Sequence, residues 1–296
     1  MLRYAAIDIG SNAVRLLIAD ILINDKELIA RKNTLLRVPL RLGDEAFIDG
    51  EISQGKAEKM VKTCRAFKEL MEVYNVKDYF ACATSAMRDA SNGPAIVNAC
   101  QKEGVDINII DGGREARIIY SSHLHQVLNP KRVYLYIDVG GGSTEVSIFA
   151  KGKFVESKSF NLGTIRILDN QDSPETWEAL GDWVKEHTAS YKQVYGIGTG
   201  GNINKLSRLI NSGADKPFSY EKLLTIYHHL EKYSLKERIL KLGLREDRAD
   251  VIIPATEIFL HIMKQANLKN VFTPRVGLVD GIIQTLMDKH KENILS

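Results

Sequence analysis

The sequence is 296 residues long, with 44% hydrophobic and 26% charged residues. These fractions are typical of a globular protein with a substantial core, and they exclude a disordered chain. A chain of this length forms one large domain or two of ordinary size. The formal net charge of +3 is too small to indicate a nucleic-acid-binding protein, although it allows a local basic surface.

Cysteine spacing and hydropathy indicate the compartment. The three cysteines, Cys64, Cys82 and Cys100, form no C-x-x-C pair, which is typical of reduced, buried thiols in a cytosolic protein. The N-terminus has a strand pattern rather than a signal peptide, and no apolar run reaches the roughly 18 residues of a membrane span. We therefore expect a cytoplasmic protein with neither nucleic-acid nor membrane partners. Its oligomeric state stays open between a monomer and a homodimer.

The first half of the chain begins with a β-hairpin. Apolar strands at 4–9 and 14–21 flank a Gly-Ser-Asn turn. The further expected elements are a strand around 28–38, a long amphipathic helix capped by Ser53, a strand at 79–84, a helix opened by Pro94, a strand at 107–110 and a helix from about 114 to 128.

The second half repeats this order. The expected elements are strands at 133–138, 144–150 and 154–160, a helix at 175–189, a strand at 193–197, a mainly helical remainder with a short strand near 270–273, and a final helix from about 278. Such alternation predicts an α/β fold in which helices flank mixed sheets. We expect two similar domains flanking a cleft, 1–126 and 127–296, with a boundary near 124–132 and a final helix able to pack back on the first domain.

The sequence of the hairpin turn occurs twice in the chain. IDIGSNAVRLLIAD at 7–20 is matched by IDVGGGSTEVSIFA at 137–150, with aspartate and glycine in the same places. Glycine lets backbone N–H groups approach a phosphate closely, and the two aspartates at the strand ends can hold a divalent cation. The residues expected to bind phosphate are Ser11, Asn12 and Arg15 in the first copy and Gly140, Gly141, Gly142 and Thr144 in the second. The alternative is a pair of tight hairpins that use glycine for geometry alone.

A third glycine cluster, GIGTGGN at 196–202, follows an apolar strand and precedes a helix. The amides at a helix N-terminus favour an anion, so Gly198, Thr199, Gly200 and Gly201 are further candidates for phosphate binding. The cluster is neither a P-loop nor a Rossmann fingerprint. A plain strand-to-helix turn is the alternative.

Several segments together resemble one family. They are IDIGSNAVRLLI, ATSAMRDASN, REARIIY, IDVGGGSTEVSI, GIGTGGN, RADVIIPATEIF and VGLVDGI, in this order. The chain resembles the exopolyphosphatase/guanosine pentaphosphate phosphohydrolase family over nearly its whole length, in its short, two-domain form. The resemblance implies two domains of the actin-like, Hsp70-like (ribonuclease H-like) ATPase superfamily.

The resemblance also implies site residues. Glu115 aligns with the glutamate that activates water in the family, while Asp138, Ser143 and Glu145 match its catalytic loop. Asp138 and Glu145, together with Asp8, are the carboxylates expected beside Mg²⁺. For Glu115, a purely structural role at a helix N-terminus is the alternative, because the helix dipole favours a carboxylate there.

Arginines are the expected partners of the phosphates. Arg88 is suited to bidentate phosphate binding, with a surface salt bridge to Asp89 as the alternative. Arg15, Arg117 and Arg166 are also expected at or near the cleft. The chain departs from the family's pattern at two places. Arg114 precedes the proposed base where an acidic residue is typical, and Asn202 ends the third loop where threonine is common.

The expected function is magnesium-dependent release of terminal phosphate from inorganic polyphosphate or guanosine pentaphosphate. The sequence does not rank the two substrates, because both present the same terminal anhydride. An ATP-dependent kinase of the same superfold is one alternative, although no acceptor site is evident. A catalytically silent protein that binds polyphosphate or the alarmone is another, favoured by Arg114 alone.

Overall fold

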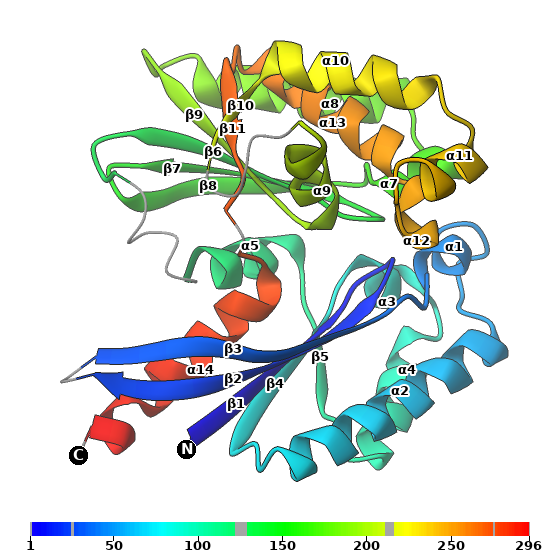
Figure 1. The fold of residues 1–296 in the computed structure, drawn as a ribbon, viewed down its shortest axis with the longest axis vertical. Coiled ribbons are helices and arrows are strands. Elements are labelled where there is room, and N and C mark those ends of the chain that lie inside the picture. The colour runs from blue at the N-terminus through cyan, green and yellow to red at the C-terminus, as the bar shows by residue number, and fades with distance from the viewer. Residues whose placement is uncertain (1, 25–26, 122–128, 211–215, 275, 296) are drawn as a thin grey trace. The chain divides into compact units, whose positions relative to one another are not determined.

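The computed structural model describes residues 2–24, 27–121, 129–210, 216–274 and 276–295. The chain forms two compact units (Figure 1). The first joins Met1–His125 with Val276–Ser296, and the second is Gln126–Arg275. The domain boundary predicted between residues 126 and 127 falls outside the described residues.

The first unit is built on a five-stranded mixed sheet with the strand order β3-β2-β1-β4-β5. Its strands are β1 (Leu2–Ile9), β2 (Val14–Asn24), β3 (Glu27–Val38), β4 (Asp78–Ala83) and β5 (Ile107–Ile109). β1 pairs antiparallel with β2 and parallel with β4. β1 is a continuous apolar run buried over most of its length, as expected for a central strand.

The helices of this unit follow the predicted order, with two short additions. They are α1 (Gly43–Ala46), α2 (Gln54–Val73), α3 (Ser85–Asp89), α4 (Gly93–Lys102), α5 (Gly112–Ser121) and α14 (Leu278–Leu295). The side chain of Ser53 accepts a hydrogen bond from the Lys56 N–H, which confirms the predicted cap of α2. The short helices α1 and α3 were not predicted. The predicted helix end near residue 128 lies outside the described residues.

The second unit contains a six-stranded mixed sheet with the order β10-β11-β9-β6-β7-β8. Its strands are β6 (Val133–Val139), β7 (Thr144–Ala150), β8 (Lys153–Phe160), β9 (Val194–Thr199), β10 (Phe218–Ser219) and β11 (Asn270–Phe272). Its helices are α7 (Thr164–Leu168), α8 (Pro174–Thr188), α9 (Gly201–Leu209), α10 (Tyr220–Glu231), α11 (Leu235–Leu240), α12 (Glu246–Ala249) and α13 (Ile252–Gln265).

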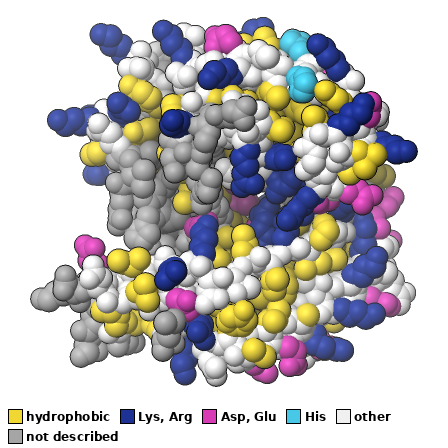
Figure 2. Space-filling model, in the orientation of Figure 1, with side chains coloured by type: hydrophobic (Ala, Val, Ile, Leu, Met, Phe, Trp, Pro, Cys, Tyr) yellow, Lys and Arg dark blue, Asp and Glu magenta, His cyan; other side chains and the backbone are white. Residues whose placement is uncertain are grey.

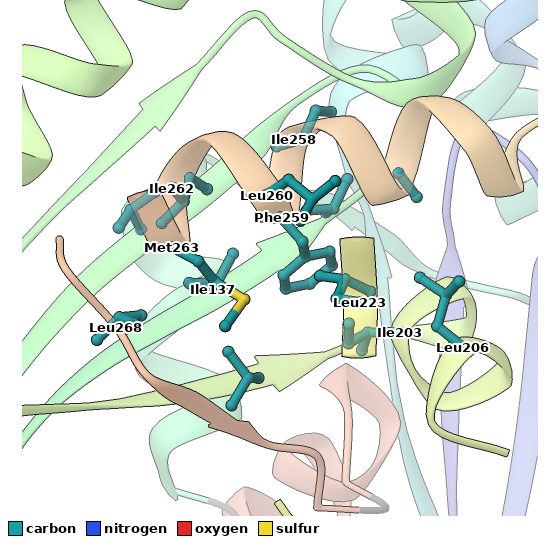
Figure 3. Close-up of a cluster of buried hydrophobic side chains, with 14 of the residues drawn as sticks. Ile137, Ile203, Leu206, Leu223, Ile258, Phe259, Leu260, Ile262, Met263 and Leu268 are labelled. Atoms are coloured by element: carbon teal, nitrogen blue, oxygen red, sulfur yellow. The ribbon is translucent and has the colours of Figure 1, made fainter. Parts of the chain in front are cut away.

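Helix α13 carries much of the second unit's core. Its apolar side chains, among them Phe259 and Met263, contact those of the sheet and of α9 (Figure 3). Most of its turns bury apolar residues, which is the pattern of a helix enclosed by other elements rather than one lying on a surface.

The two sheets share a plan. β6 pairs antiparallel with β7 and parallel with β9, as β1 pairs with β2 and β4. The predicted α/β class is confirmed, because each unit has a mixed sheet with helices, and the repeated sequence corresponds to a repeated hairpin.

The last helix, α14, belongs to the first unit and packs against α5 and β1. Asp78 at the start of β4 accepts hydrogen bonds from Lys289 Nζ at 2.9 Å and from His290 Nε2 at 2.7 Å. Lys32 of β3 forms an ion pair with Asp280 at 2.7 Å. In the part of the chain that the structure describes, no helix combines the length and apolar character needed to cross a membrane.

Candidate functional site

The first hairpin closes tightly at the end of β1. The Gly10 N–H donates to the Ala13 carbonyl at 3.2 Å, and Ser11 Oγ lies 2.9 Å from Ser85 Oγ. Asp8 lies directly opposite Arg15 across the two strands, and Arg15 Nη1 bonds Asp8 Oδ2 at 2.5 Å. The turn therefore contacts the start of α3 at the carboxyl end of the sheet.

Helix α5 carries Glu115 in its first turn. Asp111 caps this helix, because its Oδ1 accepts from the Arg114 N–H at 2.7 Å and its carbonyl accepts from the Glu115 N–H at 3.0 Å. The pKa of Cys82, at the end of β4, reflects the burial of this residue and the charges near it. Burial is the largest cause that raises the pKa of its thiol to about 12; the charges of Asp8 and Glu115 contribute to this rise, and that of Arg114 opposes it. Strand β5, which directly precedes α5, runs parallel to β4 and β4 runs parallel to β1, so Glu115 and Asp8 lie at the same edge of the first sheet.

Arg88 of α3 contacts both Asp89 and the segment just before α5. Its Nη1 donates to the Ile110 carbonyl at 3.1 Å, and its Nε lies 3.6 Å from Asp89 Oδ1. The salt bridge that we considered as an alternative is present. The bond to Ile110 also holds the guanidinium next to Asp111, the cap of the helix that carries Glu115.

The second hairpin closes in the same way, with the Gly140 N–H donating to the Ser143 carbonyl at 2.9 Å. Its turn rests on the segment before α7. A Cβ on Gly163 would lie 2.3 Å from the Gly141 carbonyl oxygen, so only glycine allows this approach. Arg166 Nε donates to the Gly142 carbonyl at 2.7 Å, which places this predicted arginine at the loop.

Asp138 and Glu145 lie directly opposite each other on β6 and β7. Glu145 is buried and accepts hydrogen bonds from Ser143 Oγ at 2.6 Å and from Ser159 Oγ at 2.9 Å. The structure thus brings together the three residues predicted for the catalytic loop. Ser159 is an addition, which follows from its position opposite Glu145 on β8.

The third loop connects β9 to α9. Thr199 pairs with Asp138 across β9 and β6, and its Oγ1 lies 2.6 Å from the hydroxyl of Tyr136. Gly200 has a φ of 98°, a conformation that L-residues rarely adopt, and a Cβ there would lie 2.9 Å from Asp138 Oδ1. The loop of Gly198–Gly201 therefore lies beside the Asp138 carboxylate within the second unit.

The sequence did not identify Arg248 of α12 as a site residue. Its guanidinium lies against Gly201, where an added Cβ would be 2.2 Å from Nη2. A cation is thus placed at the N-terminus of α9, where the helix dipole favours an anion. The available signal was the segment RADVIIPATEIF, in which Arg248 is the first residue.

Lys and Arg side chains are spread over both units on the face shown in Figure 2, so their number alone does not mark a site. The contacts that each arginine makes distinguish the candidates for the site from the others. The guanidinium of Arg114 lies over the Phe80 ring, 5.8 Å from its centroid. Arg117 is exposed on α5, and residues two positions apart in a helix do not face each other. The geometry therefore gives Arg117 less support beside Glu115 than it gives Arg88.

The carboxylates of the second hairpin fit Mg²⁺ best. No group of three or more His, Cys, Asp or Glu side chains within the described ranges is placed to hold a metal ion by itself. Mg²⁺ is commonly bound through one or two carboxylates, with water and substrate phosphates as the other ligands. Adjacent Asp138 and Glu145 suit this mode, whereas Asp8 is engaged by Arg15.

Comparison with known structures identifies the fold. An exopolyphosphatase from Cytophaga hutchinsonii matches with a TM-score of 0.85 at 23% identity, over 97% of this chain and 98% of that one. The Ppx/GppA family member of Aquifex aeolicus matches with a TM-score of 0.77 at 23% identity, over 98% of both chains. The chain therefore has the mixed α/β fold with two sheets that these proteins have.

Sequence comparison gives the family. A guanosine-5'-triphosphate,3'-diphosphate pyrophosphatase of Pseudoalteromonas translucida is 26% identical over 98% of this chain, which spans 61% of that relative's length. A bifunctional 3-dehydroquinate synthase/phosphatase of Fusobacterium nucleatum is 29% identical over 62% of this chain and 30% of that relative. The family model described as the Ppx/GppA phosphatase family matches residues 29–290. The chain therefore belongs to the Ppx/GppA phosphatase family.

Proposed function

We propose that this protein is a magnesium-dependent phosphohydrolase that releases terminal orthophosphate from inorganic polyphosphate or guanosine pentaphosphate. The observation that carries the proposal is the placement of Glu115. It lies in the first turn of α5, whose N-terminus is fixed by the Asp111 cap, at the same edge of the first sheet as the turn of the first hairpin. Family membership supplies the reaction class.

The chemistry requires a water molecule to attack the terminal phosphorus while the bridging P–O bond breaks. Glu115 orients this water and accepts its proton, and the products are orthophosphate and a chain shorter by one phosphate. The side chains of Arg15 and Arg88, with the amides of the glycine-rich turns, neutralise the phosphoryl oxygens. Asp138 and Glu145 are the residues that would hold Mg²⁺, which supplies further charge neutralisation at those oxygens when bound.

The names of relatives and the chemistry support the proposed substrate class. The Cytophaga structure is named an exopolyphosphatase and the Pseudoalteromonas relative a guanosine pentaphosphate pyrophosphatase. Both names describe attack on a terminal phosphoanhydride. The roles proposed for the site residues concern phosphate rather than a base or ribose, and they therefore fit both substrates equally.

The direct test is phosphate release from polyphosphate and from guanosine pentaphosphate, side by side, with Mg²⁺ and with EDTA. We expect release that requires Mg²⁺ and is strongly reduced, at limiting Mg²⁺, in Asp138→Asn. Transfer of phosphate to an added acceptor without release would indicate a kinase. Tight binding of polyphosphate without turnover would indicate a silent sensor, and either result would contradict the proposal.

A further inference from the structure

The two duplicated hairpins differ in charge at equivalent positions. Asp8 of the first lies directly opposite Arg15, whereas Asp138 of the second lies opposite Glu145. Residues directly opposite in an antiparallel pair lie on the same face with their Cβ atoms about 5 Å apart. The first hairpin therefore pairs its aspartate with a cation, and the second places two carboxylates side by side.

The neighbouring strands extend this difference. Arg37 on β3 lies opposite Arg15, while Ser159 on β8 lies opposite Glu145. Like charges directly opposite in a sheet repel each other, and a ligand of the other sign reduces that repulsion. Such a ligand is an anion for Arg15 and Arg37 and a cation for Asp138 and Glu145.

The exposure of the Asp8–Arg15 pair is unequal. The Asp8 side chain is 5% exposed and that of Arg15 is 33% exposed. A buried carboxylate is costly unless a charged or hydrogen-bonding group compensates it, and Arg15 Nη1 does so at 2.5 Å. The carboxylate is thus the anchored partner, and the guanidinium is the partner that reaches solvent.

We infer that Asp8 is a positioning residue, which holds the guanidinium of Arg15 ready for an anionic phosphoryl group, and that Asp8 is not a ligand of Mg²⁺. To bind a cation, the Asp8 carboxylate would have to leave its partner and place the cation beside Arg15. In the second hairpin, the residue opposite the aspartate is a second carboxylate instead of a cation. The identity of the anion as a phosphate chain rests on the proposed function.

The inference is tested by tripolyphosphate binding in EDTA, which removes the metal from the measurement. We expect Asp8→Asn to weaken binding by about tenfold, because Arg15 loses its charged anchor, and Arg15→Gln to weaken it at least as much. The double variant should bind no more weakly than Arg15→Gln alone, since Asp8 acts through Arg15. If Asp8 were merely a negative charge near the anion, Asp8→Asn would bind more tightly.

Asp20→Asn is the matched control. Asp20 forms a cross-strand pair with Arg3 at the other end of the same hairpin, with 2.7 Å between Arg3 Nε and Asp20 Oδ1. Losing this ion pair should leave tripolyphosphate binding unchanged. If Asp20→Asn weakened binding as much as Asp8→Asn, a general loosening of the hairpin would explain both results, and the inference would fail.

A second readout separates this inference from the proposed function. The Mg²⁺ concentration that gives half-maximal phosphate release should be unchanged in Asp8→Asn and raised several-fold in Asp138→Asn. A raised requirement in Asp8→Asn, additive effects of the two substitutions, or no tripolyphosphate binding by the unsubstituted protein in EDTA would each overturn the inference. If the unsubstituted protein released no phosphate, the proposed function would fail, while the binding measurements would still decide the role of Asp8.

Discussion

Single side chains in this protein connect elements that are distant in sequence. Arg88 reaches from α3 to the carbonyl of Ile110, and Arg248 reaches from α12 to the third glycine loop. Residue types at the strand ends predicted which side chains would gather at the two hairpins. The sequence alone could not predict the contact of Arg248, because that contact depends on how α12 packs beside α9.

Replacing Arg88 with alanine should raise KM about tenfold for long and short phosphate chains alike. The reason is the loss of a charge-assisted contact to the reacting end, which both chains share. The measurement is steady-state phosphate release with substrates of two lengths. Asp89→Asn is the control, because it removes the ion-pair partner of Arg88, which lies 3.6 Å away, and keeps the guanidinium. Equal kinetics for Arg88→Ala and the unsubstituted protein would show that Arg88 forms only a surface salt bridge and does not bind the substrate.

At the scale of elements, the hairpins were predictable and the short helices were not. Alternating apolar residues and glycine turns define both hairpins, and the turn length fixes the register that places Asp8 opposite Arg15. The pairing of Asp8 with Arg15 could therefore have been predicted from the sequence, although we expected Asp8 to lie beside the metal. The helices α1, α3 and α7 have four or five residues, which is too short for a helical period to show.

The contact between α14 and α5 should be sensitive to a single methyl group. A Cβ on Gly281 would lie 1.9 Å from the Ile118 carbonyl oxygen, so Gly281→Ala must displace one helix from the other. Overpacking of this kind typically costs about 1–3 kcal/mol, and we expect a lower melting temperature and a lower kcat, because α5 carries Glu115. Gly277→Ala is the control, since its Cβ would meet nothing within 4 Å. Equal melting temperatures and rates for the two variants would show that this contact is not tight.

At the scale of the whole molecule, the sequence predicted two similar α/β halves, because the same order of elements occurs twice. The return of the last helix to the first unit combines buried apolar residues of α14, among them Ile282 and Met287, with polar contacts across long sequence separations. Asp78 and Lys289 are 211 residues apart, and no local pattern links them. Only the folded chain shows that α14 packs beside β1 and α5.

The anchoring of α14 should depend on pH through Asp78. Burial raises the pKa of this carboxyl, but hydrogen bonds from His290 and Lys289 outweigh that effect and hold the pKa below its ordinary value. A lowered folded-state pKa stabilises the protein above the unfolded pKa of about 3.9, and this stabilisation is lost as pH falls through the folded pKa. Asp78→Asn should therefore lower the melting temperature at pH 7, and the difference should shrink as pH falls below about 3.9 and through the folded pKa of Asp78.

The control for Asp78 is Glu72→Gln, which breaks an exposed pair with Lys68 on α2 and should change the melting temperature little at either pH. A difference between Asp78→Asn and the unsubstituted protein that persisted unchanged into acid would show that its charge does not anchor α14.

The most direct test of the central claim is Glu115→Gln, measured for turnover, substrate affinity and melting temperature in one series. The substitution keeps the shape of the side chain and removes the base, and loss of a general base typically costs about 10²–10⁴-fold in rate. We predict a fall in kcat of this size, with affinity for polyphosphate unchanged or tighter, and with a melting temperature close to that of the unsubstituted protein. Full activity in a stable Glu115→Gln protein would contradict the account.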